Sequence, residues 1–217
     1  MRRSSVKLTD KAEQKEGSRG AALFLPAAQG KRRLTGQAEG ATMKKRRGNM
    51  EFVLRRWKEE DAASIQSYAN HEKIAANLRN VFPYPYPPGA AAQYIRSCIE
   101  QEGDGQVTRA IAVDGTAVGS IGVFFGSDVY EKSAELGYWL GEPFWNQGIM
   151  SEAVVKMCRY VFSKYNIERI FAEPFAGNAA SRRVLEKAGF SLEGILKNSI
   201  YKNGVLQDSC MYALTRR

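Results

Sequence analysis

The chain has 217 residues, of which 44% are hydrophobic and 25% charged, enough to bury the core of one domain or of two small ones. Three widely spaced cysteines without a CxxC pair argue against a disulfide framework, and a single histidine, His71, excludes a multi-histidine metal site. No stretch approaches the roughly 20 apolar residues of a membrane-spanning helix, and residues 21–28, broken by Pro26, lack a signal-peptide layout. We therefore expect a soluble cytoplasmic protein without a bound metal.

The whole net charge of +9 lies in the first quarter of the chain. Residues 1–49 contain 13 Lys or Arg and 4 Asp or Glu, whereas the remaining 168 residues contain 19 of each. Because this segment shows no sustained period of 2 or 3.6 residues, we interpret it as a disordered basic extension ahead of one domain over residues 50–217. Its four cations at 44–47 are suited to weak contact with RNA or another polyanion. The alternatives are a solvated tail, or a start codon placed too early with Met50 as the true first residue.

From residue 50 onward the hydrophobic pattern changes between helical and extended periods. It predicts, in chain order, a strand over 52–57, a helix over 59–70, a helical piece over 71–78, an irregular connection over 80–89, a helix over 90–102, and strands over 106–113, 116–125 and 133–140. Acidic residues at 59–61 complement the positive end of the first helix dipole, and four prolines in six positions forbid regular structure in the connection. Asp114-Gly115 marks a tight hairpin, and Gly137 indicates a bulge or a close backbone approach.

The second half of the chain contains the longest predicted helix. It runs from after Gly148 to about residue 164 and is followed by a strand over 169–173, a helix over 178–187, and strands over 190–197 and 206–214 around Asn203-Gly204. The buried stripe of the long helix is predicted to comprise Met150, Val154, Cys158, Val161, Phe162 and Tyr165. We interpret Cys158 as a core residue and not as a nucleophile. The element order predicts a mixed α/β (α+β) domain with a strand–helix–strand crossover in its middle.

The clearest chemical signal is the strand, turn and helix start at 135–152. A helix N-terminus has up to four N–H groups without an intrahelical partner and can bind phosphate oxygens. The turn lacks the lysine of a nucleotide-binding P-loop, and it does not match GxGxxG. A pyrophosphate held by main-chain amides without lysine or magnesium points to a cofactor such as coenzyme A. The alternative is an ordinary helix start.

Two motifs in this region resemble one enzyme family. The string ELGYWLGEPFWNQGIMSEA at 135–153, with NAASRRVLEKAGF at 178–190, closely resembles the GCN5-related N-acetyltransferases, and within them the ribosomal-protein N-terminal acetyltransferases typified by RimJ and RimL. The resemblance extends over about residues 51–215. It implies a mixed, mostly antiparallel sheet flanked by helices, with strands 4 and 5 splayed apart to admit acetyl-CoA. The family pattern Q/R-x-x-G-x-G/A appears here as WNQGIM, with Trp145 and Met150 at its outer places, a form usual for the RimJ/RimL branch.

The same resemblance implies which residues bind the co-substrate. Main-chain N–H groups of the loop would bind the pyrophosphate, and amides at a strand edge would face the pantetheine arm. The implied cofactor-binding residues are Tyr138, Trp139, Leu140, Trp145, Asn146, Gln147, Gly148, Ile149, Met150, Ser151, Asn178 and Ser181. The acceptor would be a primary amine, which in the RimJ/RimL branch is a protein N-terminus. Whether the protein is a monomer or a homodimer stays open.

Direct transfer of an acetyl group to an amine requires one group that deprotonates the amine and another that protonates the thiolate. Glu135, on the strand that opens the cleft, is the candidate to take the amine's proton through water, unless it is a solvent-facing carboxylate. Ser181 either protonates the thiolate or only binds the cofactor. The RimL-like pattern has a Glu near the position of Ile200, and its absence makes the adjacent Tyr201 a substitute candidate. A strand amide near 138–140 would stabilise the oxyanion, and no cysteine acyl-enzyme is expected.

The acceptor side is less defined by the sequence. Phe82, Tyr84 and Tyr86, in the proline-rich connection, either border the acceptor or cover the core. We interpret His71 as a surface or capping residue, and the spacing of Gly119 and Gly122 as strand geometry. An α-amine of pKa ~8 needs only about 1.4 kcal/mol to reach its neutral form at pH 7, against about 4.6 kcal/mol for a lysine of pKa ~10.4.

The expected function is therefore acetyl transfer from acetyl-CoA to a protein N-terminal α-amine. Acetylation of a small amine, such as a polyamine, an amino acid or an aminoglycoside, is one alternative. Another is a nucleic-acid- or ribosome-binding protein that acts through its basic extension. The third is a domain that binds coenzyme A without catalysis.

Overall fold

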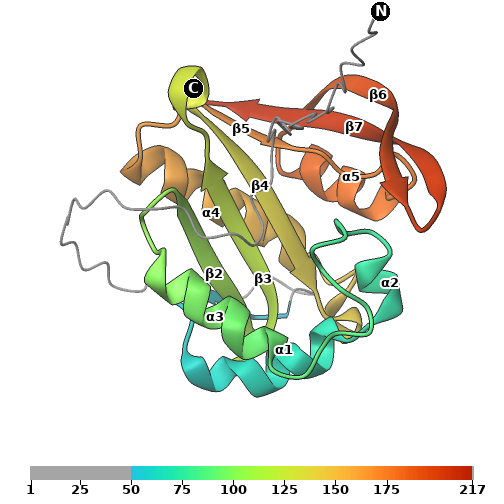
Figure 1. The fold of residues 1–217 in the computed structure, drawn as a ribbon. Coiled ribbons are helices and arrows are strands. Elements are labelled where there is room, and N and C mark those ends of the chain that lie inside the picture. Colours follow the sequence, from blue (N-terminus) through green and yellow to red (C-terminus); the bar gives the residue numbers. More distant parts are fainter. Residues whose placement is uncertain (1–49, 217) are drawn as a thin grey trace, which may run out of the picture.

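The computed structural model describes residues 50–216, which are built on one seven-stranded sheet (Figure 1). The predicted basic extension, residues 1–49, lies outside the described residues. The strands are β1 (Val53–Arg55), β2 (Gln106–Val113), β3 (Thr116–Phe125), β4 (Ser133–Leu140), β5 (Arg169–Ala172), β6 (Ser191–Lys202) and β7 (Val205–Thr215). The helices are α1 (Ala62–Ala69), α2 (Glu72–Ala75), α3 (Ala90–Glu100), α4 (Ile149–Lys164) and α5 (Ala179–Lys187).

The sheet is mixed and mostly antiparallel, as predicted. Its order is β1-β2-β3-β4-β5-β7-β6, and the one parallel pair among these neighbours is β4 and β5, which α4 connects. The β4–β5 pairing extends only from Ser133 to Glu135. From Leu136 to Leu140, β4 pairs with β3 but not with β5. The expected splay between strands 4 and 5 is therefore confirmed, and it begins at Glu135.

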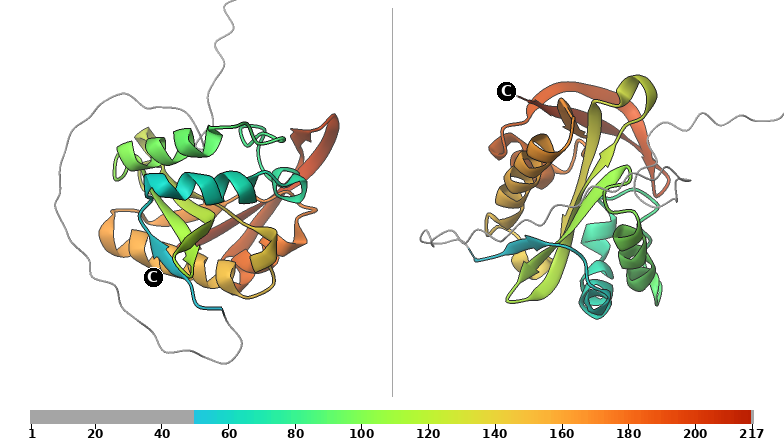
Figure 2. Two further views of the ribbon diagram at one scale, coloured as in Figure 1. Left: turned by 90° about the horizontal axis from the view of Figure 1, so that it is seen from below. Right: turned by 90° about the vertical axis from the view of Figure 1, so that its left-hand side faces the viewer.

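Helices cover both faces of the sheet, and each layer encloses its own core. In the right-hand view of Figure 2 the sheet is seen edge on, with α4 on one face and α1 and α3 on the other. The core on the α4 side includes Val154 and Met157 from α4 and Leu185 from α5. The core on the α1 and α3 side includes Ile65 and Ile95. Strands β4 and β5 therefore lie between two layers of helices.

Both predicted hairpins are confirmed by backbone geometry. Asp114 and Gly115 have φ angles of 47° and 80° between β2 and β3. Asn203 and Gly204 have φ angles of 51° and 80° between β6 and β7. A two-residue type I′ turn requires positive φ at both central positions, which favours Asp-Gly and Asn-Gly.

The bulge considered at Gly137 is wrong, because β3 and β4 pair without a register shift there. The shift in this part of the sheet lies in β2, between Ile111 and Ala112. A close backbone approach, the other interpretation of Gly137, is found at Gly119, where an added Cβ would lie 2.5 Å from the Trp139 carbonyl oxygen. Gly119 lies within β3, so the interpretation of its spacing as strand geometry is confirmed.

Several predicted boundaries need correction. The strand expected over 52–57 is only β1, and the acidic turn forms a separate 3-10 helix, Glu59–Asp61, ahead of α1. Strand β6 continues to Lys202, beyond the expected end at 197. The proline-rich connection at 80–89 contains no strand and no helix, as predicted.

The predicted stripe of α4 is partly correct. Val154, Cys158 and Val161 are buried, whereas Met150, Phe162 and Tyr165 are half-buried and pack against the same core. The stripe missed three buried residues of α4: Ile149, Ala153 and Met157. Within residues 50–216, no helix is both long and apolar enough to cross a bilayer.

Candidate active site

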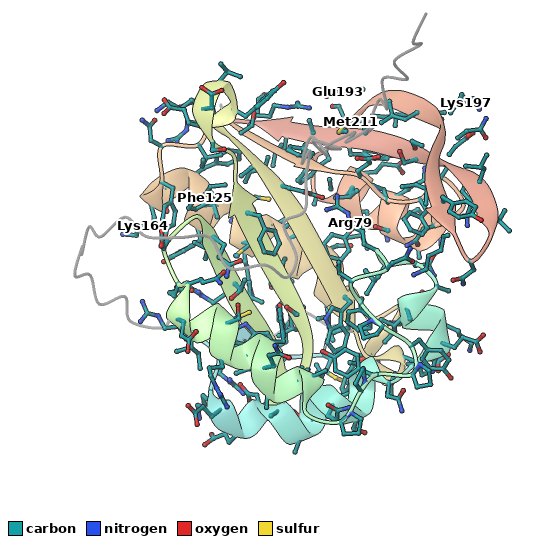
Figure 3. All side chains as sticks on the ribbon, in the orientation of Figure 1. Arg79, Phe125, Lys164, Glu193, Lys197 and Met211 are labelled. Atoms are coloured by element: carbon teal, nitrogen blue, oxygen red, sulfur yellow. The ribbon has the colours of Figure 1, made fainter. Side chains whose placement is uncertain are left out.

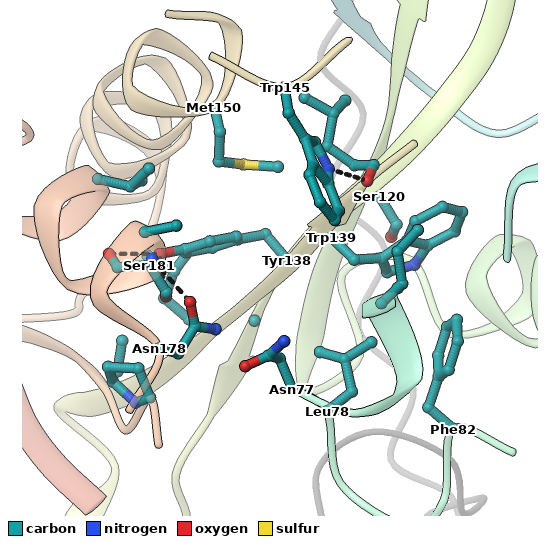
Figure 4. Close-up of a pocket in the computed structure, with 18 of the residues that line it drawn as sticks. Asn77, Leu78, Phe82, Ser120, Tyr138, Trp139, Trp145, Met150, Asn178 and Ser181 are labelled. Carbon is teal, nitrogen blue, oxygen red and sulfur yellow. Dashed lines mark hydrogen bonds between the residues drawn. The ribbon is translucent and has the colours of Figure 1, made fainter. Parts of the chain in front are cut away.

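A cavity of about 460 Å³ lies where β4 and β5 diverge. Its walls come from β4, the turn at 141–148, the start of α4, the end of β5, α5 and the segment that follows α2. All of the predicted cofactor-binding residues line this cavity, several of them labelled in Figure 4, and the cavity lining also includes Glu135. Phe82 and Tyr86 line it as well, whereas Tyr84 and Tyr201 do not. The structure thus brings together predicted residues as far apart in the chain as Phe82 and Ser181.

The turn before α4 presents backbone N–H groups to the cavity. Asn146 and the N-cap residue Gly148 have left-handed backbones, with φ angles of 60° and 78°. The first intrahelical bond of α4 runs from Glu152 N to Gly148 O at 3.2 Å, so within the described residues the amides of 149–151 have no backbone acceptor. These amides stand at the positive end of the α4 dipole, an arrangement that binds phosphate oxygens.

Side chains hold this turn in place without using those amides. Trp145 donates its indole N–H to the Leu140 carbonyl at 2.7 Å, which ties the turn to the end of β4 (Figure 4). Gln147 donates its side-chain amide to the Pro143 carbonyl at 2.8 Å. The donors of the turn are therefore preorganised before any ligand is present.

The open edge of β4 supplies a second set of backbone groups. Backbone N–H and C=O groups of a strand point alternately to its two neighbours. From 136 to 140, β4 has β3 on one side and the cavity on the other. The amides of a pantetheine arm would find hydrogen-bond partners along this edge, as an added strand does.

A hydroxyl pair closes the cavity between β4 and α5. The Tyr138 hydroxyl lies 2.8 Å from the Ser181 Oγ and donates to the Ser181 carbonyl at 3.3 Å. Asn178, the N-cap of α5, accepts from the Ser181 amide at 3.0 Å, which fixes the start of that helix (Figure 4). Burial raises the pKa of Tyr138 well above its ordinary value, so its hydroxyl keeps its proton.

Glu135 is not the solvent-facing carboxylate that was the alternative. Its side chain is only 12% exposed and forms an ion pair with Arg79, from the segment that follows α2. Figure 3 places Arg79 between the α2 layer and the strands β4 and β5. Burial raises the pKa of Glu135, and this effect exceeds the lowering by Arg79. Glu135 is therefore a better proton acceptor than an exposed carboxylate.

A second carboxylate in the cavity, Glu173, was missed by sequence reasoning. It directly follows β5 and accepts a hydrogen bond from the Ser209 hydroxyl at 2.6 Å. Its negative charge contributes to the raised pKa of Glu135, so the two carboxylates interact electrostatically. One signal was present in the sequence: a carboxylate at the end of a half-buried strand, just before Pro174.

The aromatic residues of the proline-rich connection divide into two groups. Phe82 and Tyr86 are buried with ring centroids 5.1 Å apart, and Phe82 packs edge to face against Trp139. They cover the core and border the cavity at once, so the two alternatives do not exclude each other. Tyr84 is 51% exposed, and Tyr201 is 67% exposed on β6, so neither contributes to the cavity lining.

His71 occupies the N-cap position of α2, but its side chain makes no capping hydrogen bond. Its Nε2 lies 2.7 Å from the Glu142 carboxylate, which also contacts the Lys73 ammonium at 2.5 Å. These contacts join α2 to the beginning of the turn that precedes α4. His71 therefore acts as a contact residue near the surface.

The cysteines are core residues. Cys98, Cys158 and Cys210 are all buried and unbridged. Burial raises the pKa of Cys98 to about 11 and that of Cys158 to about 12, which opposes thiolate formation. Within residues 50–216, no cluster of three or more His, Cys, Asp or Glu is arranged to hold a metal ion.

Comparison with known proteins agrees with this geometry. Residues 51–191 match the family model of the acetyltransferase (GNAT) domain. The putative ribosomal N-acetyltransferase YdaF of Bacillus subtilis (strain 168) is 32% identical over 111 residues, which cover 51% of this chain and 60% of YdaF. This chain thus spans less than two thirds of the length of that curated relative. The uncharacterized N-acetyltransferase p20 of Bacillus licheniformis is 31% identical over 169 residues, which cover 76% of this chain and 93% of p20.

A solved structure shows the same fold. RimL, described as a ribosomal L7/L12 alpha-N-protein acetyltransferase in complex with coenzyme A, matches with a TM-score of 0.68 at 23% identity. The match covers 77% of this chain and 96% of RimL. The family model covers well over half of the sequence, and the predicted sheet, splay and turn are all present. The chain therefore belongs to the GNAT acetyltransferase family.

Proposed function

We propose that this protein transfers an acetyl group from acetyl-CoA to the α-amine of a protein N-terminus. The observation that carries the proposal is the cavity at the β4–β5 splay. It joins the free amides of the α4 turn, the open edge of β4 and two carboxylates in one space. Backbone donors for a diphosphate and proton acceptors for an amine are what such a transfer requires.

The residues present fit acetyl-CoA as the co-substrate. The amides of 149–151 would hold its pyrophosphate, and the β4 edge at 138–140 would hold its pantetheine arm. This path would direct the thioester toward Tyr138 and Ser181, where β4 faces α5 (Figure 4). The co-substrate supplies an already activated acetyl group, so the protein's tasks are positioning and proton transfer.

We assign the proton transfers to residues in the cavity lining. Glu135 takes a proton from the acceptor amine through a water molecule. Ser181, whose Oγ lies 2.8 Å from the Tyr138 hydroxyl, gives its proton to the departing thiolate, and the proton taken up by Glu135 then restores the Ser181 hydroxyl through water. An oxyanion that develops at the acetyl carbonyl is stabilised by an amide of the β4 edge. Tyr201 has no part in this scheme, since it lies outside the cavity lining.

Two observations favour an α-amine acceptor: the lower free energy of its deprotonation and the names of the similar proteins. The neutral form of an α-amine at pH 7 is about 3 kcal/mol more accessible than that of a lysine. YdaF is named a putative ribosomal N-acetyltransferase, and RimL is described as an alpha-N-protein acetyltransferase. Phe82 and Tyr86 would contact the residues that follow the amine. A reaction of this kind on ribosomal proteins belongs in the cytoplasm.

We further propose that residues 1–49, with their net charge of +9, bring the enzyme to a polyanion such as RNA. Removal of these residues should leave acetylation of a free peptide unchanged and abolish RNA affinity together with its steep salt dependence. A truncated protein that loses peptide acetylation would contradict this division of roles.

A panel of acceptors tests the main proposal. Purified protein and acetyl-CoA are mixed with peptides that carry a free N-terminal Ser or Ala, with polyamines and with aminoglycosides, and the free thiol is measured. Turnover on the peptides supports the proposal. Turnover confined to small amines contradicts the α-amine assignment and supports a small-amine acetyltransferase. Acetyl-CoA binding without turnover on any amine contradicts the proposed acetyl transfer.

A further inference from the structure

The proposed reaction releases one proton to solvent in each turnover, and Glu135 takes only one of the two protons that the acceptor ammonium loses. An acceptor ammonium loses two N–H protons on becoming an amide, and only one of them ends on the sulfur of coenzyme A. The second must reach solvent in every turnover. We propose that Glu173 is a second catalytic carboxylate, which takes this proton and passes it through the hydroxyls of Ser209 and Ser199 to solvent. This inference rests on the proposed acetyl transfer.

Glu173 is placed to meet the same amine as Glu135. In the β4–β5 register Glu135 is opposite Phe171, and Glu173 follows two residues later. Side chains two positions apart on a strand lie on the same face. Both carboxylates line the cavity, and the charge of Glu173 influences the ionisation of Glu135. The two carboxylates differ in their partners, since Glu135 forms an ion pair with Arg79 and Glu173 accepts a hydrogen bond from Ser209.

A continuous chain of hydroxyl groups leads from Glu173 to the surface. The Ser209 hydroxyl, fully buried, donates to the Glu173 carboxylate at 2.6 Å. The Ser199 Oγ lies 2.7 Å from the Ser209 Oγ, and Ser199 is exposed. Ser199 also donates to the Leu196 carbonyl at 3.1 Å, so its proton has more than one acceptor. One buried hydroxyl therefore separates the cavity from a solvent-exposed hydroxyl.

The proton transfer balances without any other reactant. An N–H bond of the amine breaks as an O–H bond forms on Glu173. That proton then passes to the Ser209 Oγ while the proton of Ser209 passes to the Ser199 Oγ, and Ser199 releases its own proton to water. Rotation of the two hydroxyls restores the starting arrangement, in which Ser209 donates to Glu173.

The local backbone is shaped to hold this chain together. The β6–β7 register shifts between Leu196 and Ile200, which bends β6 at Asn198, a residue with a φ of 52°. Asp208 fixes the bend by accepting from the Asn198 amide at 2.9 Å and from the Lys197 ammonium at 2.8 Å. Such bulges commonly re-aim a side chain next to an active site. Here the bend brings the Ser199 hydroxyl to Ser209.

The backbone beside Ser209 holds the inner end of the hydroxyl chain in place. The Cys210 amide donates to the Pro174 carbonyl at 2.9 Å, so the segment after β5 is bonded to β7 beside Ser209. A buried hydroxyl costs free energy unless it is hydrogen-bonded. A proton path explains why hydroxyl groups occupy these two positions, which packing alone does not require.

The test compares kcat and KM of full-length variants, with acetyl-CoA and a peptide whose N-terminal residue is Ser. Glu173→Gln keeps the shape and an acceptor oxygen for Ser209, so a purely structural role survives the change. We expect kcat to fall about 100-fold with KM unchanged. Ser199→Ala should lower kcat about fivefold, and Ser199→Thr, which keeps the hydroxyl, should restore it. Ser163→Ala, which removes an exposed hydroxyl on α4 that donates to Tyr160 O, is the matched control and should change nothing.

Buffer dependence separates a proton path from a structural contact. In Ser199→Ala, increasing imidazole concentration should raise kcat toward the wild-type value, because the buffer replaces the missing carrier, whereas the wild type should not respond. An unchanged kcat in Glu173→Gln or in Ser199→Ala overturns the inference while the wild-type turnover upholds the proposed function. A wild type that binds acetyl-CoA but acetylates no amine overturns both. Since Ser199 is exposed, its variants keep the test valid even where Glu173→Gln fails to fold.

Discussion

The hydroxyl groups of Tyr138 and Ser181 lie 2.8 Å apart and join β4 to α5 across the cavity. Their arrangement puts a proton donor within reach of the gap through which the thioester would enter. Ser181 is held by the hydrogen bond that its backbone N–H donates to the Asn178 side chain. Tyr138 is held by the pairing of β4 with β3. Neither hydroxyl depends on a mobile loop for its position.

Removal of the Ser181 hydroxyl should slow the chemical step. Ser181→Ala is expected to lower kcat about 100-fold with little effect on acetyl-CoA affinity, because general acid catalysis is lost while the backbone donors remain. Tyr138→Phe should have a smaller effect in the same direction. Thiol release under saturating acetyl-CoA measures both variants. The control is Tyr130→Phe, at a tyrosine that is 67% exposed, and equal kcat values for all three variants would remove the pair from the mechanism.

The left-handed backbone of Gly148 should be needed for acetyl-CoA binding. A Cβ at this φ of 78° costs roughly 1–2 kcal/mol and would distort the turn that carries the free amides. Gly148→Ala is therefore expected to weaken acetyl-CoA binding about tenfold, as measured by calorimetry. Gly204→Ala introduces the same strain, at a φ of 80°, in the β6–β7 turn. Equal affinities for the two variants would show that the turn does not bind the diphosphate.

The acidic limb of the pH–rate profile should report the environment of Glu135. Burial raises the pKa of this carboxyl and Arg79 lowers it, with burial the larger effect. Removing the cation in Arg79→Gln should therefore raise the pKa of Glu135 further and move the acidic limb of kcat upward by roughly one pH unit. Arg56→Gln, at an arginine whose side chain is 74% exposed, should leave the profile in place. A limb that stays fixed in Arg79→Gln would exclude Glu135 as the titrating base.

Stability should depend on the pair formed by Asp61 and Arg55, ahead of α1. The buried Asp61 carboxylate accepts two hydrogen bonds from Arg55, at 2.6 and 2.7 Å, and one from the Lys58 amide at 3.0 Å. Burial alone would raise the pKa of Asp61, but these bonds outweigh it and lower the value. Asp61→Asn should therefore reduce the free energy of unfolding by about 2 kcal/mol at pH 7.

The pH dependence of this loss has a definite sign. A carboxyl whose pKa is lower in the folded than in the unfolded protein stabilises the fold above the unfolded pKa and loses that contribution as pH falls through the folded value. The difference between Asp61→Asn and the wild type should accordingly shrink below about pH 3.9. Urea unfolding at several pH values measures it, with the exposed Asp104→Asn as control. A constant difference down to low pH would rule out the ionised pair as its source.

Local signals predicted the central strands well. The bounds of β2, β3 and β4 agree with those expected, because apolar residues and Asp114-Gly115 define them within a short window. The end of β6 was missed because Lys197-Asn198-Ser199 is polar, and only the distant Asp208 holds that bend in the strand. A short window contains no information about such a partner.

The same difference between local sequence signals and contacts with distant residues applies to the candidate site. The turn and α5 motifs placed every implied cofactor residue at the cavity, since each motif is local. Arg79 and Glu173 were missed because their positions depend on contacts with Glu135 and Ser209, which are 56 and 36 residues away. Tyr201, the substitute candidate for a carboxylate near Ile200, is 67% exposed and lies outside the cavity lining.

The α-amine preference is the most direct test of the whole account. A peptide with a free N-terminal Ser and one internal Lys is incubated with acetyl-CoA and the full-length protein, and fragment masses locate the acetyl group. We predict one acetyl group, on the α-amine, with the lysine unmodified. Acetylation of the lysine with a free N-terminus, or no acetylation of this peptide while a small amine is consumed, would contradict the account.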